Sequence, residues 1–206
     1  MRFGFGSPPV FVETERLALK PVASRDYEAW ANLRSYSIEH LRRWEPAWPE
    51  DAHSRDDWRR RLFVWNDLKK SGRGYILHIW RKTDKALLGA VSLTNIQFPP
   101  ISTARLGYWL GAEHTGHGYM REAVQAACNW AHRELEIVRI EAATLPENEP
   151  SQAVLENAGF EKEGFARSYL QICGERRDHI LYALILDPLA RPQLHDPIRT
   201  AARQSG

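Results

Sequence analysis

The sequence has few cysteines, no long apolar run and almost no net charge, and each shortage excludes a class of protein. Cys128 and Cys173 are the only cysteines in 206 residues, too few for a disulfide framework or a four-thiolate metal site. No apolar stretch approaches the ~18 residues that a membrane-spanning helix needs. Lys and Arg number 28 against 26 Asp and Glu, so no general attraction to nucleic acid or lipid is expected. Together these shortages favour a globular, cytoplasmic protein with reduced thiols.

Aromatic side chains are what the chain has in excess, with eight Trp, seven Tyr and seven Phe. Five of the tryptophans lie between Trp30 and Trp65. The length fits a single domain, which we expect to span residues 12–186. A loose leader, rich in Gly, Pro and Phe, is expected at 1–11, and a tail at 187–206.

The hydrophobic pattern predicts a mixed α/β, α+β fold: a largely antiparallel sheet of about seven strands with about four helices on both faces. Strands are expected at Arg16–Val22, Gly74–Trp80, Leu87–Ile96, Ala104–Leu110, Val138–Leu145, Phe165–Ile172 and His179–Leu186. Helices are expected after caps at Ser24 and Ser54, from Tyr119 to Leu135, and from Pro150 to Asn157. His40–Pro49, with two Trp and two Pro, is expected to be an ordered loop.

Two glycines precede the longest predicted helix. Gly116-x-Gly118 lies in the loop between the strand at Ala104–Leu110 and the helix at Tyr119. Such a loop can aim several backbone N–H groups at one point, and the helix N-terminus adds partial positive charge. The loop lacks Gly-Lys-Ser/Thr, and it lacks the third Gly and later acid of a dinucleotide fingerprint. Taken alone, the loop is therefore either a turn that merely joins the strand to the helix or an anion site of another kind.

A second informative segment follows about 30 residues later. Asn148 follows the strand predicted at Val138–Leu145, Ser151 lies in the first turn of the predicted helix, and that helix is expected to end at Gly159. Taken alone, these positions read as an N-cap, a first-turn residue and a C-cap.

The two segments together resemble the GNAT acetyltransferase family, and most closely its ribosomal-protein N-acetyltransferase branch, the RimJ/RimL type. Further matching signatures include Glu13-Thr14-Glu15-Arg16-Leu17, Leu106-Gly107-Tyr108-Trp109-Leu110, Arg139-Ile140-Glu141-Ala142 and Asp178-His179-x-Leu181-Tyr182. In this order they span about Val12–Leu186, which is nearly the whole chain.

The resemblance implies a splayed sheet with acetyl-CoA between the strands at Ala104–Leu110 and Val138–Leu145. The pantetheine arm would pair with the backbone at Trp109, Leu110 and Gly111. The pyrophosphate would bind the loop formed by Thr115, Gly116, His117, Gly118, Tyr119, Met120 and Arg121. Glu113 is expected to point outward, away from the phosphates. No metal is implied.

The resemblance also suggests catalytic roles. Many family members use a Tyr to protonate the CoA thiolate, but Leu155 stands at that position here. The branch pattern places Ser151 near the sulfur instead, with Asn148 positioning it. The usual base positions carry Arg105 and Tyr169-Leu170, so Glu141 and His179 remain the candidates for the base that deprotonates the amine.

The acceptor would enter from the other side, over the first two helices, where Trp44 and Trp48 would wall its cleft and Tyr108 and Tyr169 would contact it. The leading expectation is a protein N-terminus, with ribosomal protein S5 as the type substrate of the RimJ branch. A small amine such as a polyamine, amino acid or antibiotic, or a non-catalytic acyl-CoA-binding module, are the alternatives. We expect a monomer or homodimer without membrane or direct nucleic-acid contact. The basic clusters Arg42-Arg43 and Arg59-Arg60-Arg61 remain open as docking points for a ribosomal partner.

Overall fold

The computed structural model describes residues 12–186, so the expected leader at 1–11 and tail at 187–206 lie outside the described residues. The described chain has eight strands: β1 (Val12–Glu13), β2 (Leu17–Pro21), β3 (Tyr75–Arg81), β4 (Leu87–Gln97), β5 (Thr103–Leu110), β6 (Arg139–Thr144), β7 (Glu161–Ile172) and β8 (Glu175–Ile185). Its α-helices are α1 (Tyr27–Tyr36), α2 (Ile38–Arg42), α3 (Arg55–Lys70), α4 (Tyr119–Leu135) and α5 (Glu149–Asn157). Short 3₁₀ helices, η1 (Ser24–Asp26) and η2 (Ala112–His114), precede α1 and α4.

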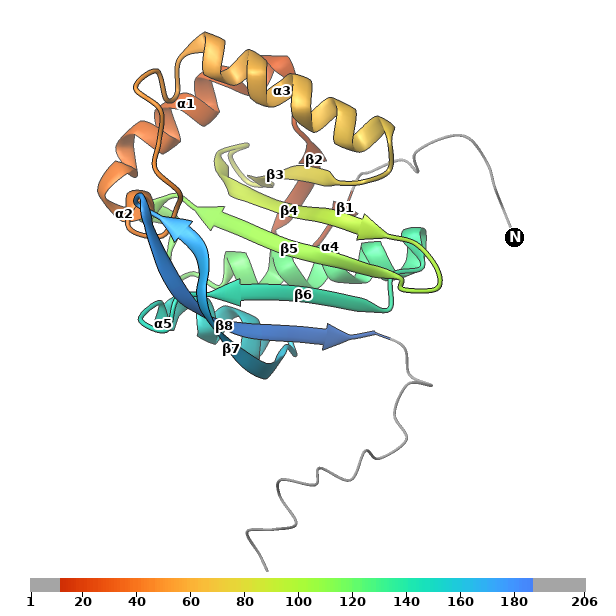
Figure 1. The fold of residues 1–206 in the computed structure, drawn as a ribbon. Helices are drawn as coiled ribbons and strands as arrows, with labels where there is room; N and C mark the ends of the chain where they lie inside the picture. Colours follow the sequence, from red (N-terminus) through yellow and green to blue (C-terminus); the bar gives the residue numbers. More distant parts are fainter. Residues whose placement is uncertain (1–11, 187–206) are drawn as a thin grey trace, which may run out of the picture.

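All eight strands join one sheet in the order β1-β2-β3-β4-β5-β6-β8-β7. Every neighbouring pair is antiparallel except β5 and β6, which are parallel. That parallel pairing covers only Thr103–Arg105 against Arg139–Glu141. Beyond it β5 remains paired with β4, and β6 remains paired with β8. The two strands therefore part in the middle of the sheet (Figure 1).

Helices cover both faces of the sheet, as the sequence predicts (Figure 1). The amphipathic face of α4 is buried at all of its expected positions: Met120, Ala123, Val124, Ala127 and Ala131. On the opposite face, α1 and α3 bury Trp30 and Trp58 together with Leu87 of β4. Burial of one large apolar side chain contributes about 1.5–3 kcal/mol. Each face of the sheet therefore has its own stabilising core.

Two local predictions near the N-terminus are wrong. Ser24 does not cap the first helix, because it lies inside η1. The Asp26 carboxylate instead accepts a hydrogen bond from the Ala23 backbone N–H at 3.0 Å and contacts His78 Nδ1 at 3.0 Å. The segment from His40 is not all loop, because its first residues complete the five-residue helix α2. So short a helix leaves no periodic signal in the sequence.

Other elements differ in their limits. The two-residue strand β1 and the helix α2 are not expected from the sequence. Among the described residues there are therefore eight strands, against about seven expected, and five α-helices, against about four. β7 and β8 begin earlier than expected and form a long hairpin with irregular register. Ser54 caps α3 as predicted and accepts from the Asp57 N–H at 3.1 Å. In a capping box the Asp57 carboxylate would accept from the backbone N–H of Ser54, the N-cap residue. Here it accepts from the N–H of His53, one residue earlier.

Candidate functional site

A cleft of about 760 Å³ opens where β5 and β6 separate. One wall is β5 from Leu106 to Leu110, and the opposite wall is β6 with the start of α5. Its β5 wall is an unpaired strand edge, because the ladder with β6 ends at Arg105. An unpaired edge offers backbone N–H and C=O groups to a ligand.

Two of the three residues predicted to bind pantetheine line the cleft. Trp109 and Leu110 line the cleft, whereas Gly111 does not. The Gly111 N–H donates to the Leu88 carbonyl oxygen at 2.8 Å. Because backbone groups alternate along a strand, Leu110 presents its N–H to the other edge of β5, toward the cleft. A Cβ at Gly111 would lie 2.4 Å from Leu33 Cδ1, so close packing explains this glycine.

The loop ahead of α4 forms one end of the cleft. Gly116 and Gly118 have φ of +80° and +75°, which L side chains rarely adopt. Of the predicted phosphate loop, Thr115, Gly116, Gly118, Tyr119, Met120 and Arg121 line the cleft. His117 does not, and its carbonyl oxygen accepts from Arg16 Nη1 at 2.9 Å. Glu113 is exposed, as expected, and its carboxylate lies 3.4 Å from His114 Nε2.

A clamp formed by Thr14, Arg16 and Glu122 holds this loop from the N-terminal strands. Arg16 Nε donates to Glu122 Oε2 at 2.7 Å, and the Arg16 backbone N–H donates to Oε1 at 3.2 Å. The Thr14 hydroxyl also donates to Oε1 at 2.5 Å. Burial works to raise the pKa of Glu122, but the hydrogen bonds from Thr14 and Arg16 outweigh it and lower that pKa. The sequence places these residues in two family signatures but does not predict that they meet.

Three polar side chains gather deeper in the cleft. The Tyr108 hydroxyl lies 2.8 Å from Ser151 Oγ and donates to the Ser151 carbonyl oxygen at 3.1 Å. Asn148 caps α5, its side-chain oxygen accepting from the Ser151 N–H at 3.2 Å. Burial raises the pKa of Tyr108 despite its bond to Ser151, so its phenol is neutral. The sequence nominates all three residues but misses the Tyr108–Ser151 contact, because it joins β5 to α5.

The two candidate bases have different surroundings. His179 is buried and lines the cleft. Its Nδ1 lies 3.1 Å from the Arg177 carbonyl oxygen, which only accepts, so Nδ1 carries a hydrogen, and in the neutral tautomer Nε2 is the nitrogen with the lone pair. Glu141 is not among the cleft-lining residues, and its carboxylate accepts from Arg139 Nε at 2.9 Å. The geometry therefore favours His179 over Glu141.

A smaller cavity of about 250 Å³ lies beneath α1 and α3. It shares Glu45, Gly107, Tyr108 and Trp109 with the large cleft. Its other walls include Trp30, Trp65 and Arg34. The two cavities thus meet across β5.

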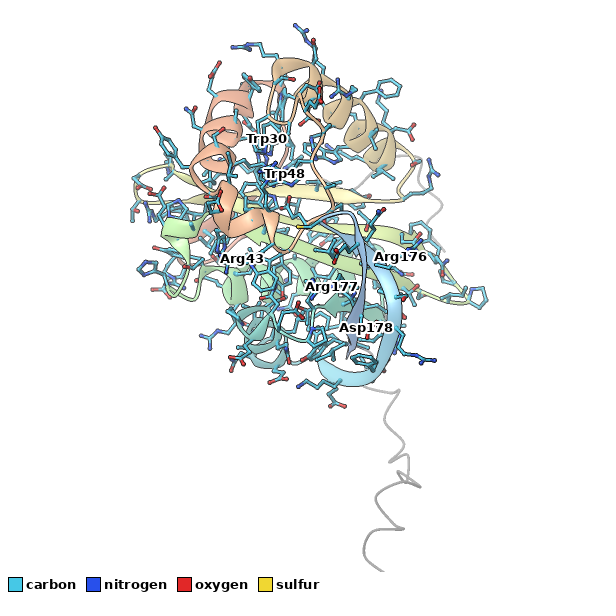
Figure 2. The ribbon with its side chains drawn as sticks, turned by 60° about the vertical axis from the view of Figure 1, so that its left-hand side comes forward. Trp30, Arg43, Trp48, Arg176, Arg177 and Asp178 are labelled. Atoms are coloured by element: carbon cyan, nitrogen blue, oxygen red, sulfur yellow. The ribbon has the colours of Figure 1, made fainter. Side chains whose placement is uncertain are left out.

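The aromatic residues expected on the acceptor side do not all reach a cavity. Tyr108 lines both cavities and Trp44 lines the large cleft, but Trp48 and Tyr169 line neither. Trp48 packs 4.6 Å from His53, with its indole N–H donating to Glu45 Oε2 at 2.8 Å. Trp30 and Trp48 both pack against His53. In Figure 2, Trp48 lies below Trp30 in the view, with Arg43 lower still and Arg176, Arg177 and Asp178 on the β7–β8 hairpin.

The basic clusters are largely engaged within the chain. Arg59, Arg60 and Arg61 pair with Asp56, Asp51 and Asp57. Arg42 and Arg43 lie over the rings of Trp48 and Trp44. Within residues 12–186, no group of three or more His, Cys, Asp or Glu is placed to hold a metal ion. No helix in that part of the chain is long and apolar enough to cross a membrane.

Comparison with known proteins agrees with this geometry. A family model for the acetyltransferase (GNAT) domain matches residues 16–161. The ribosomal protein uS5-alanine N-acetyltransferase of Escherichia coli (strain K12) is 34% identical over 184 residues, covering 88% of this chain and 95% of the relative. A ribosomal-protein-S5-alanine acetyltransferase structure from Vibrio fischeri has a TM-score of 0.80 and 34% identity, covering 87% of this chain and 98% of that one. The structure of Mycobacterium smegmatis RimJ in complex with CoA-disulfide has a TM-score of 0.84 and 30% identity, covering 90% of this chain and 91% of that one.

Proposed function

This chain belongs to the GNAT family and is an acetyl-CoA-dependent N-acetyltransferase, and from that premise we propose that its acceptor is the N-terminal α-amine of a protein, with ribosomal protein S5 the leading substrate. One observation carries the choice of acceptor: the chain is similar to an enzyme named for acetylating alanine of uS5, and the match covers 95% of that enzyme's length. The cavity beneath α1 and α3 supports it, because a chain end entering there meets the large cleft at β5.

We assign residues 12–186 to the acetyltransferase domain and the large cleft to acetyl-CoA. A helix N-terminus preceded by two glycines at positive φ suits the pyrophosphate, because its backbone N–H groups are free of Cβ interference. The open edge of β5 suits the amide groups of pantetheine. The Thr14–Arg16–Glu122 clamp keeps the loop in place for the phosphates.

Deprotonation of the amine is assigned to His179, directly or through water, because a protonated amine cannot attack a thioester. The unprotonated Nε2 is the acceptor, and the Arg177 carbonyl fixes the tautomer. The nitrogen lone pair then forms the C–N bond, and the Leu110 N–H supports the negative oxygen that develops on the thioester carbonyl.

Ser151 is assigned as the donor to the departing thiolate, and Asn148 as the residue that positions it. As the C–S bond breaks, the Ser151 hydroxyl, which lines this cleft, passes a proton to the departing sulfur and takes one back from water, to which the newly bonded nitrogen releases its second proton. Tyr108 orients the Ser151 hydroxyl through the 2.8 Å contact.

We propose that the protein is a cytoplasmic monomer or homodimer and that it binds its protein substrate without contacting nucleic acid. The absence of nucleic-acid contact is supported by α3, where Arg59, Arg60 and Arg61 already pair with neighbouring carboxylates.

A thiol-release assay with acetyl-CoA tests the acceptor. One panel contains peptides that begin with Ala, Ser or Met, each also supplied with a blocked N-terminus and a free Lys. A second panel contains polyamines, amino acids and aminoglycosides. We expect thiol release only with free N-termini, and mass spectrometry should place the acetyl group on the first residue. Turnover on small amines alone would overturn the proposed acceptor, and tight CoA binding without any turnover would favour a binding module.

A further inference from the structure

Glu45 lies at the junction of the two cavities. It lies in the segment that joins α2 to α3 and lines both the large cleft and the smaller cavity. Among the residues that the structure describes, no other Asp or Glu lines either of these cavities. Any cationic group that passes from the smaller cavity toward the cleft therefore meets this carboxylate.

Three contacts hold Glu45 in that position. Arg34, buried on α1, binds both carboxylate oxygens, with Nη1 3.2 Å from Oε1. The Trp48 indole N–H donates to Oε2 at 2.8 Å. The Glu45 backbone carbonyl accepts from the Cys173 N–H at 3.1 Å, which ties the segment to the tip of the β7–β8 hairpin. The side chain is thus fixed before any ligand arrives.

The carboxylate retains capacity for one more donor. A carboxylate has about four acceptor positions, and three are taken by Arg34 and Trp48. Of the two oxygens, Oε1 has only the longer 3.2 Å contact with Arg34. The side chain keeps 22% of its surface exposed, against 5% for Arg34. A further hydrogen bond at Oε1 is therefore available to a ligand.

The surrounding walls suit a cation as well. Trp30, Trp65 and Trp109 contribute aromatic rings to the smaller cavity. Arg34 already lies over the rings of Trp30 and Trp109, so Trp65 is the ring that offers its face to an ammonium group. The other guanidinium in this wall, Arg61, is already neutralised by Asp57 at 2.9 Å. Arg34 and Trp48 hold the Glu45 carboxylate in place, and an ionised acceptor forms strong hydrogen bonds, so recognition of a donor is the role it fits.

We propose that Glu45 binds the ammonium group of the acceptor and so selects a free amino terminus at the junction of the two cavities. This inference rests on the proposed function, because it presumes that the acceptor enters beside α1. Arg34 and Trp48 are positioning residues that act through Glu45. A purely structural Glu45 would only neutralise buried Arg34, and the two roles differ in what they predict for ligands.

The experiment compares two peptides bound to the protein in the presence of saturating CoA. One peptide begins with Ala, and the other carries a propanoyl group in its place, which keeps the shape and removes the amine. Calorimetry gives the ratio of their dissociation constants for the wild type, Glu45→Gln and Glu45→Asp. The single oxygen of Gln can accept from Arg34 Nη2 and the Trp48 N–H in place of Oε2, while its NH2 group faces Arg34 Nη1, so one of the three contacts is lost.

We expect the wild type to prefer the Ala peptide by roughly 10- to 100-fold, the contribution of one charge-assisted hydrogen bond. Glu45→Gln should bring the ratio close to one with CoA affinity unchanged, and Glu45→Asp should restore part of it. Glu163→Gln is the matched control, since Glu163 binds Arg139 with both oxygens and lies outside both cavities. It should keep the wild-type ratio.

Two outcomes overturn the inference: a wild type without preference for the Ala peptide, and a Glu45→Gln variant that keeps the preference. If Glu45→Gln lowers stability, Glu45→Asp decides: a ratio between one and the wild-type value supports the inference, and an unchanged wild-type ratio overturns it. Failure of the proposed function is separate, because it shows as an absence of wild-type turnover on every free N-terminus.

Discussion

Replacing Ser151 by Ala should slow the reaction without disturbing the fold. The hydroxyl is lost, but the Tyr108 phenol keeps its hydrogen bond to the Ser151 carbonyl oxygen at 3.1 Å. No buried donor is left without a partner, so the free energy of unfolding should fall by about 1 kcal/mol or less. Asn148 also keeps its bond to the Ser151 backbone N–H, so α5 remains capped.

The loss in rate follows from the charge on the departing sulfur. A hydrogen bond to a charged group contributes about 1.5–3 kcal/mol, and about 1.4 kcal/mol corresponds to a factor of ten. Ser151→Ala should therefore reduce kcat by roughly 10- to 100-fold, while the Kd for CoA stays within about two-fold. Tyr108→Phe should produce a smaller loss, because it removes only the group that orients Ser151.

Thiol release measures kcat, and calorimetry measures CoA binding. A second acetyl donor, the thioester of a more acidic thiol, sharpens the test because its leaving group needs no proton. With that donor, Ser151→Ala should approach the wild-type rate. Thr94→Ala is a suitable control, since the Thr94 hydroxyl donates to the Arg105 carbonyl oxygen at 3.5 Å away from both cavities. An unchanged kcat, or an equal loss with both donors, would refute the assignment of Ser151.

Three further perturbations test the supports of the site. Glu122→Gln removes the charge that binds Arg16 and should raise the Kd for CoA by about 3- to 10-fold, whereas unchanged CoA binding would show that the loop holds itself. Gly89→Ala would place a Cβ 2.1 Å from a backbone carbonyl oxygen of β5 and should cost about 2–4 kcal/mol in thermal unfolding, while Gly164→Ala, with nothing within 4 Å, should cost little. Burial, aided by the nearby guanidinium groups of α1 and α3, lowers the pKa of His53 to about 4. The unfolded chain therefore binds a proton that the folded chain rejects, and stability should fall by about 1–2 kcal/mol between pH 6.5 and 4, a slope that should be reduced in His53→Gln when urea midpoints are compared.

Local signals in the sequence determined several parts of this protein. The apolar face that begins at Met120 repeats at helical spacing, and α4 runs over the expected residues from Tyr119 to Leu135. The cap at Asn148 and the glycines of the phosphate loop are equally local, because the groups that interact lie within a few residues of one another. Family signatures in their order then indicated the fold and the acetyl-CoA chemistry.

Only the tertiary structure decided which of the nominated residues share a site. Glu141 and His179 are both acceptable bases by residue type, but Glu141 pairs with Arg139 outside the cleft while His179 lines it. Glu45 carries no local signal at all, and its importance comes from the place where two cavities meet across β5. The physical reason is the same in each case. A cavity is lined by segments distant in sequence, and their meeting depends on where β5 and β6 part, which no window of neighbouring residues encodes.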